Sequence, residues 1–199
     1  MNKAILILTL LFEVVIGKGF LFGQHLMHYA SEDYNYSMLL PEDWKRNDNV
    51  KNPKVSLVLV SPTGAAVSVS NYTNQETYTN GSAEGTIKEE QLEGLRSKFR
   101  EQFIEGHISA YSKSLDEFQL QEKGTILARD DEADYLVFTY TKEKTPMREK
   151  VCFFMKEIHV AIISAKQEDV LFHKSLPVFD KIFVSFTFET EQDKVEKVD

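Results

Sequence analysis

Two apolar runs bracket most of this chain. The first places a large apolar or aromatic side chain at every second position, stops at Pro41 and turns onto Trp44, the single tryptophan; its members are Tyr34, Tyr36, Met38 and Leu40. The second covers residues 182–188 and carries three phenylalanines. Alternation with a period of two is typical of a strand with one buried face. The two runs predict the limits of one compact α+β domain over residues 34–188.

Between these limits the pattern predicts a hairpin, a loop and a helix. Two strand-like runs, 55–60 and 66–72, flank the turn-forming residues 61–64, and polar residues up to about 85 predict a long exposed loop. Thr86 and Glu89 then have the spacing of a capping box. The helix is predicted to run to about residue 105 and to stop at Gly106, with an apolar stripe that packs on a sheet: Leu92, Leu95, Phe99 and Phe103.

Period-two runs return after Gly106 and predict an antiparallel meander with strands near residues 107–115, 124–129, 135–141, 151–156 and 158–165. A helical segment follows Glu168 and Asp169. Because proline removes a helical hydrogen bond, Pro177 predicts a break or kink there, with Ser175 capping a second piece. A last strand is expected around residues 185–188. The predicted fold class is α+β, an antiparallel sheet sandwiched between helices.

The two ends of the chain differ in character from the domain. Residues 4–12 form an apolar run behind Lys3, which predicts a signal peptide over residues 1–17. A membrane anchor would need about 20 apolar residues, and Glu13 and Lys18 interrupt the run too early. Residues 18–33 are then a lead-in segment and 189–199 a charged tail. The expected location is extracytoplasmic, periplasmic or secreted, with no stable membrane anchor after cleavage.

Cysteine content and charge exclude several classes of protein. The single cysteine, Cys152, lies far from the apolar run, so neither an acylated lipoprotein nor an intrachain disulfide is expected, which favours a bacterial exported protein. The net charge of −8 argues against a nucleic-acid partner, which would need a basic surface. Neither a nucleophile elbow nor a glycine-rich phosphate loop is found. We therefore expect no enzymatic activity.

Two groups of residues carry the candidate chemistry. The first gathers carboxylates in a predicted turn, where they could bind calcium or could simply be solvated: Asp130, Asp131, Glu132 and Asp134. No other cofactor is indicated. The second consists of aromatic residues in the loop or near the ends of elements, where a ring could anchor a protein partner: Trp44, Tyr72, Tyr78 and Tyr111.

The order of these elements resembles the PsbP-like superfamily. The resemblance covers residues 34–188 and depends on the Leu40-Pro41-x-x-Trp44 turn and on the proline-containing helix that leads into Ser185-Phe186-x-Phe188. This superfamily includes extrinsic photosystem II proteins, a Ran-binding nuclear import factor, DcrB-type lipoproteins and the Eag chaperones of type VI secretion. The resemblance implies the antiparallel sheet between helices. It does not imply one function, because these proteins share a shape and not a chemistry.

Differences between this chain and members of the superfamily narrow the range of expected functions. Neither a transit peptide nor a lipid-anchoring cysteine is visible, which argues against a photosynthetic role, and the apparent export signal argues against the cytosolic and nuclear members. The sequence favours a non-catalytic exported domain that acts as a protein-interaction or assembly accessory factor. The alternative is an extracytoplasmic module that binds a ligand or a cation such as calcium.

Overall fold

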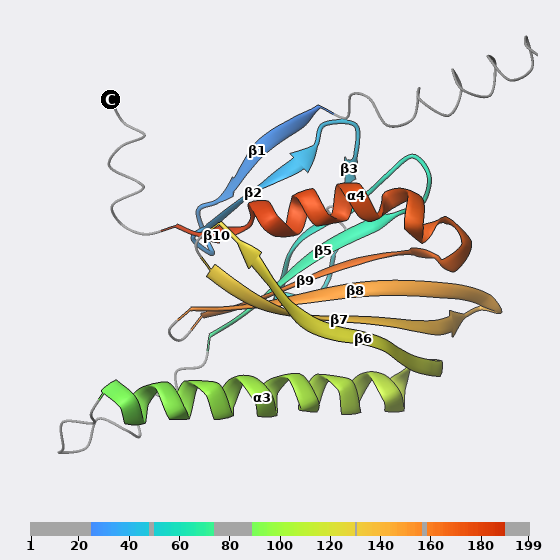
Figure 1. The fold of residues 1–199 in the computed structure, drawn as a ribbon. Helices are drawn as coiled ribbons and strands as arrows, with labels where there is room; N and C mark the ends of the chain where they lie inside the picture. The colour runs from blue at the N-terminus through green and yellow to red at the C-terminus, as the bar shows by residue number, and fades with distance from the viewer. Residues whose placement is uncertain (1–24, 48–49, 74–88, 130, 157–158, 190–199) are drawn as a thin grey trace, which may run out of the picture.

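A computed structural model describes residues 25–47, 50–73, 89–129, 131–156 and 159–189. The strands and helices follow one another along the chain as shown in Figure 1. They are β1 (Leu26–Ser31), β2 (Tyr36–Pro41), β3 (Lys45–Arg46), β4 (Val55–Val60), β5 (Ala66–Thr73), α3 (Glu89–Ser114), β6 (Asp116–Ala128), β7 (Asp131–Lys142), β8 (Thr145–Lys156), β9 (His159–Glu168), α4 (Asp169–Ser185) and β10 (Thr187–Phe188).

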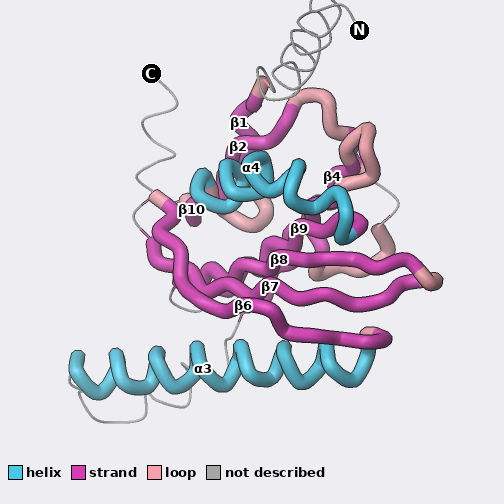
Figure 2. Tube along the Cα trace, turned by 45° about the vertical axis from the view of Figure 1, so that its right-hand side comes forward, coloured by secondary structure: helices cyan, strands magenta, loops and turns pink. Residues whose placement is uncertain are grey.

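The described elements form three layers. A seven-stranded sheet in the order β3-β4-β5-β9-β8-β7-β6 is the middle layer. Helix α3 lies along one face of this sheet, and α4 lies on the opposite face beside the small sheet β1-β2-β10 (Figures 1 and 2). The predicted α+β class, with an antiparallel sheet between helices, is therefore confirmed.

The middle sheet is antiparallel throughout the pairs that the structure describes. Consecutive strands β6, β7, β8 and β9 form a meander, and β9 then pairs with β5 of the preceding hairpin. The hairpin β4–β5 turns at residues 61–64, as predicted, with Gly64 at a positive φ of 82°. Paired residues share a face of the sheet, so the register assigns every side chain to the α3 side or to the α4 side.

The α4 side of the sheet contains the larger core. Large side chains of the α4 layer pack there against small and β-branched residues of the sheet. Tyr36 stacks on Phe186, with ring centroids 5.4 Å apart, and Phe186 in turn contacts Phe154 of β8 at 4.3 Å. Ser185 Oγ accepts a hydrogen bond from the backbone N–H of Leu39 at 2.8 Å. The end of α4 is thus fixed to the edge of β2.

Helix α3 is longer than the sequence predicted. It continues through Gly106 to Ser114, so residues 107–114 are helical and the strand predicted for 107–115 is wrong. A glycine inside a helix costs about 1 kcal/mol, and packing outweighs that cost here. Phe103, His107 and Tyr111 are four residues apart and stack along the sheet, with centroids 4.4 Å apart for the first pair and 6.1 Å for the second. The predicted start of this helix, residues 86–88, lies outside the described residues.

Two further segments differ from expectation. Helix α4 is continuous from Asp169 to Ser185 with Pro177 inside it, so the predicted break is wrong. Buried Phe172 and Phe179 on either side of Pro177 hold the helix on the core. Residues 26–31 of the predicted lead-in form β1, which pairs with β2 along its whole length. Residues 1–17 and 190–199 lie outside the described residues. Neither of the described helices is both long and apolar enough to cross a membrane.

Candidate functional site

The α3 side of the middle sheet is covered along β6, β7 and β8. Phe103 of α3 makes edge contacts with Phe153 of β8 at 6.2 Å and with Tyr72 of β5 at 6.4 Å. Further along the helix, Tyr111 lies over Phe138 of β7 at 4.9 Å. These rings form a second core that is separated from the α4 core by the sheet itself. The helix is therefore held by aromatic packing from Phe103 to Tyr111.

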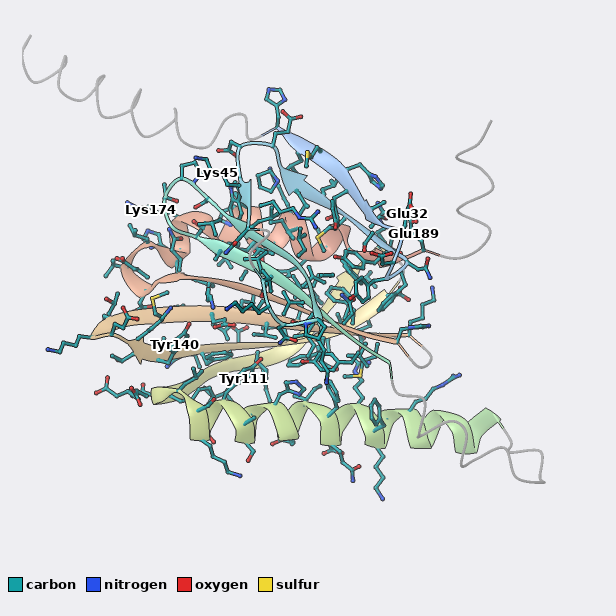
Figure 3. The ribbon with its side chains drawn as sticks, turned by 180° about the vertical axis from the view of Figure 1, so that it is seen from behind. Glu32, Lys45, Tyr111, Tyr140, Lys174 and Glu189 are labelled. Atoms are coloured by element: carbon teal, nitrogen blue, oxygen red, sulfur yellow. The ribbon has the colours of Figure 1, made fainter. Side chains whose placement is uncertain are left out.

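A polar group lies within this second core, under the C-terminal half of α3. Glu149 of β8 is 8% exposed and accepts a hydrogen bond from the hydroxyl of Ser164 on β9. Tyr111 and Tyr140 lie close by, between helix and sheet (Figure 3). Burial raises the pKa of both phenols far above the ordinary tyrosine value, and the Glu149 carboxylate raises it further. Both tyrosines are therefore neutral hydrogen-bond donors at physiological pH.

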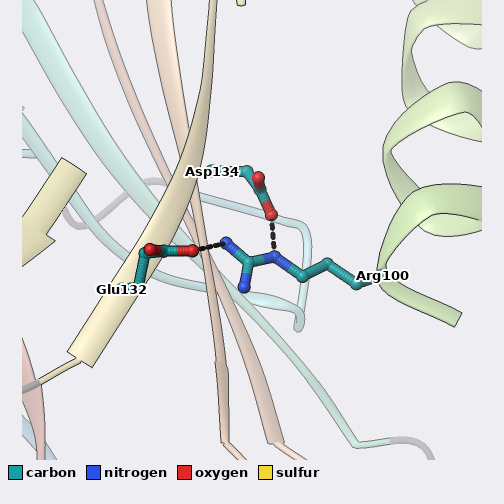
Figure 4. Close-up of polar contacts among 3 residues, drawn as sticks. All are labelled: Arg100, Glu132 and Asp134. Carbon is teal, nitrogen blue, oxygen red and sulfur yellow. Dashed lines mark hydrogen bonds and ion pairs between the residues drawn. The ribbon is translucent and has the colours of Figure 1, made fainter. Parts of the chain in front are cut away.

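An ion cluster holds α3 near its middle. The guanidinium of Arg100 contacts Asp134 through Nε and Glu132 through Nη2, the latter at 3.2 Å (Figure 4). The Asp134 side chain is 19% exposed, so this contact is partly shielded from water. Burial by itself would lower the pKa of Arg100, but its contacts with Asp134 and Glu132 raise it. The cluster fixes the position of α3 over β7.

The structure does not bring the predicted calcium ligands together at one site. Glu132 and Asp134 belong to strand β7 and not to a turn, and both face Arg100 on the α3 side. Asp131 pairs with Ala128 and lies on the opposite face, while Asp130 lies outside the described residues. Within the described ranges, no three His, Cys, Asp or Glu side chains gather closely enough to hold a metal ion. A cation at Glu132 and Asp134 would have to displace the guanidinium.

The four aromatic residues predicted as partner anchors do not form one surface. Trp44 is 7% exposed and packs against Phe179 on the α4 side, so it is a core residue. Tyr72 and Tyr111 are half-buried on the α3 side, and both pack against the aromatic core under α3. Tyr78 lies outside the described residues. The structure thus places Tyr72 and Tyr111 on one side of the middle sheet and Trp44 on the other.

Part of the α3 side of the sheet is not covered by any element that the structure describes. The α3 core reaches Tyr72 at the end of β5 and Val160 at the start of β9, but it does not include the opposite ends of these strands. Figure 3 shows α3 along the lower edge and α4 behind β4 and β5. We call this region the open face. It consists of the half-exposed or exposed residues Lys45, Val58, Val60, Ala66, Ser68, Ser70, Ser164 and Lys166.

The opposite sides of the same strands are tightly packed. Leu57, Leu59, Val67 and Val69 alternate with the open-face residues and are at most 4% exposed. By contrast, Val60 on the open face is 36% exposed. Strands with one packed face and one accessible face are ordinary at the edge of a fold, but here the accessible face continues directly from the aromatic core under α3. It is the candidate contact surface.

The α4 side has a charged contact of its own near the middle of the sheet. Lys150 Nζ lies 2.8 Å from Asp180 and 4.8 Å from the centroid of the Tyr135 ring. Cys152 is buried beneath it, and burial raises the pKa of the thiol so that it stays protonated and unreactive. Because Lys150 is bound on two sides, this group stabilises the contact between α4 and the sheet.

Similarity to known proteins is found at the level of structure. No family model matches the sequence, and no curated protein does. Cyanobacterial PsbP (CyanoP) of Synechocystis is 12% identical, with a TM-score of 0.57 over 83% of this chain and 94% of that one. The fold is PsbP-like. The same fold is found in LpqN of Mycobacterium tuberculosis (16% identical, TM-score 0.50, covering 83% of this chain and 91% of LpqN). The Ran-binding protein Mog1p of Saccharomyces cerevisiae also has it (7% identical, TM-score 0.50, covering 83% and 96%).

The PsbP-like fold predicted from the sequence is thus confirmed, and at these identities the likeness concerns the fold alone. The open face and the buried Glu149 were not found from the sequence. The signal for the open face was present in strand β5, where Ala66, Ser68 and Ser70 alternate with Val67 and Val69. Such alternation shows that one face is polar, but it does not show which helix, if any, covers that face.

Proposed function

We propose that this protein is a non-catalytic, exported PsbP-like domain that acts as an accessory factor by binding another protein. The open face carries the proposal. It is a sheet surface of small apolar and hydroxyl side chains around Val60, Ala66 and Ser68, and described elements cover the neighbouring part of the same face but not this part. Surfaces of this kind that are accessible beside a packed core commonly mark sites of protein contact.

The chemistry of the described residues supports a binding role over a catalytic one. The most buried carboxylate, Glu149, is engaged by Ser164, and the buried thiol of Cys152 is protonated. The remaining close charge pairs, such as Arg100 with Asp134, hold elements of the fold together. An active site would need several polar groups that converge on one accessible pocket, whereas these groups are buried or bound to one another.

Proteins of the same fold are described as acting in ways compatible with this proposal. Mog1p is described as a Ran-binding protein, and LpqN as involved in cell envelope biogenesis. We infer an extracytoplasmic location for the present chain from the apolar run within residues 1–17 and its basic flank. The partner we expect is therefore a component of the cell envelope.

The experiment is site-specific photocrosslinking in the native host. A photoreactive amino acid replaces Ser68 on the open face, and a matched variant carries it at His173, an exposed position on α4. We expect one envelope protein to be crosslinked from position 68 and not from position 173. If no protein is crosslinked from position 68, or if both positions crosslink the same proteins, a binding role for this surface is refuted.

The same material tests export. Mass spectrometry of the captured protein should find an amino terminus close to Lys18, because cleavage is expected after residue 17. Recovery of the chain with its first residues intact from the cytoplasmic fraction would contradict export and leave the protein-binding part of the proposal to be judged on the crosslinks.

A further inference from the structure

We infer that the partner segment that binds the open face is an acidic amphipathic helix, which lies beside α3 and completes the helical layer on this side of the sheet. The inference rests on the proposed function and specifies the chemistry of the partner. Three properties of the open face support it: its width, the size of its side chains and the sign of its charge.

The width of the sheet leaves space for a second helix. Neighbouring strands are about 4.8 Å apart, so a seven-stranded sheet is about 29 Å wide. A helix with its side chains is about 10 to 12 Å in diameter, and packed helices lie about 8 to 10 Å apart. Helix α3 packs on β6, β7 and β8 and on the near ends of β5 and β9. The remaining α3-side surface runs from β3 across β4 and β5 to the far end of β9. These four strands span three spacings, about 14 Å, which is wide enough for one more helix.

The side chains of the open face permit close approach. Ala66, Ser68, Ser70 and Ser164 are small, and Val58 and Val60 add a shallow apolar strip along β4. Within the described part of the chain, the hydroxyls of Ser68 and Ser70 have no hydrogen-bond partner, which leaves them free to donate to a carboxylate. A helix with one apolar stripe fits such a surface, because its stripe can cover the valines while its flanks meet the serines.

The charges around the open face are mostly positive, although the chain as a whole carries a net charge of −8. Lys45 lies at one margin and Lys166 at the other, and Lys54 Nζ lies 4.8 Å above the ring of Tyr72 at the far end. Among the described strand residues next to the open face, two are acidic, whereas Glu132 and Asp134 lie further across the α3 side on β7 and are bound by Arg100. Glu149 is buried and bound by Ser164, and Glu168 stands at the last position of β9. Complementarity therefore favours a partner that carries carboxylates on both flanks.

The test uses a defined probe. A fluorescent amphipathic peptide of about 20 residues carries leucine and alanine along one stripe and glutamate on both flanks, which gives a helix about 30 Å long. Its matched control has lysine in place of every glutamate. Fluorescence anisotropy measures the binding of each peptide to the full-length protein. We expect the glutamate peptide to bind at least about tenfold more tightly than the lysine peptide.

Charge reversal locates the site. The double variant Lys45→Glu with Lys166→Glu reverses both margins of the open face, and Lys174→Glu with Lys181→Glu makes the same change in net charge on exposed positions of α4. The first pair should weaken binding of the glutamate peptide about tenfold, and the second should leave it unchanged. Trp44, the single tryptophan, lies in the core on the opposite side of the sheet. Its fluorescence therefore reports whether each variant is folded.

Several results would overturn the inference. Equal binding of the two peptides, or equal sensitivity of the two double variants, would show that the open face does not select acidic helices. Binding to vesicles of anionic phospholipid, lost in the Lys45→Glu with Lys166→Glu variant while neither peptide binds, would assign the surface to a membrane instead. If position 68 still crosslinks one protein while the peptide results fail, the proposed function stands and only the helical acidic partner is wrong.

Discussion

Alkaline pH provides a test of how the described core is built, because three tyrosines are buried as neutral phenols. Tyr36 lies in the α4 core, and Tyr111 and Tyr140 lie under α3. Burial raises the pKa of each well above the ordinary tyrosine value of about 10, and Glu149 adds to the effect on the latter two. Up to about pH 9 the phenols are protonated in both the folded and the unfolded chain, so stability does not depend on them.

Above that pH the unfolded chain loses phenolic protons that the folded chain keeps. The folded state then binds more protons than the unfolded state, so the free energy of unfolding falls as pH rises. Between neutral pH and pH 11, each phenol lowers the free energy of unfolding by about 1.4 kcal/mol, so the three together lower it by about 4 kcal/mol. This is a large part of the 5 to 15 kcal/mol that is typical of a whole domain.

The assay combines urea unfolding followed by circular dichroism at several pH values with absorbance of tyrosinate at 295 nm. Three of the eight tyrosines should ionise only when the chain unfolds. The variant Tyr111→Phe should reduce the alkaline loss of stability by about a third and leave the slope from the other two phenols unchanged. Ionisation of all eight tyrosines near pH 10 in a chain that keeps its circular dichroism would refute the reasoning.

Two further predictions concern how the helices are held. The substitution Arg100→Ala leaves the Asp134 carboxylate, which is 19% exposed, without its guanidinium partner. It should lower the free energy of unfolding measured in urea titrations by about 1 to 2 kcal/mol, and adding Asp134→Asn should recover part of the loss. Equal stability of Arg100→Ala and the original chain would contradict the role of the cluster. The substitution Pro177→Ala should raise the free energy of unfolding by about 1 to 2 kcal/mol, because alanine restores a hydrogen bond inside the continuous helix α4. A lower melting temperature would show instead that the proline is needed for the path of the helix.

The sequence predicted the elements that depend on local pattern. Alternating Leu136, Phe138 and Tyr140 lie on the α3 side of β7 as a period of two requires, and the hairpin formed where residues 61–64 favour a turn. The predictions failed at Gly106 and Pro177, where a local helix-breaking preference is outweighed by packing against the sheet. The sequence pattern alone could not show which of the predicted site residues Trp44 and Tyr72 is buried and which is accessible, because core and surface aromatic residues alternate in the same way.

The sequence by itself therefore determined the α+β class, the order of most strands and the PsbP-like fold, since periodicity, turn residues and apolar runs act over a few neighbouring positions. The tertiary structure alone decided that β1 joins β2, that Arg100 pairs with Glu132 and Asp134, and that α3 covers only part of its side of the sheet. These features depend on which distant segments meet. Two surfaces with the same polar alternation become a core contact or an open face according to what packs on them.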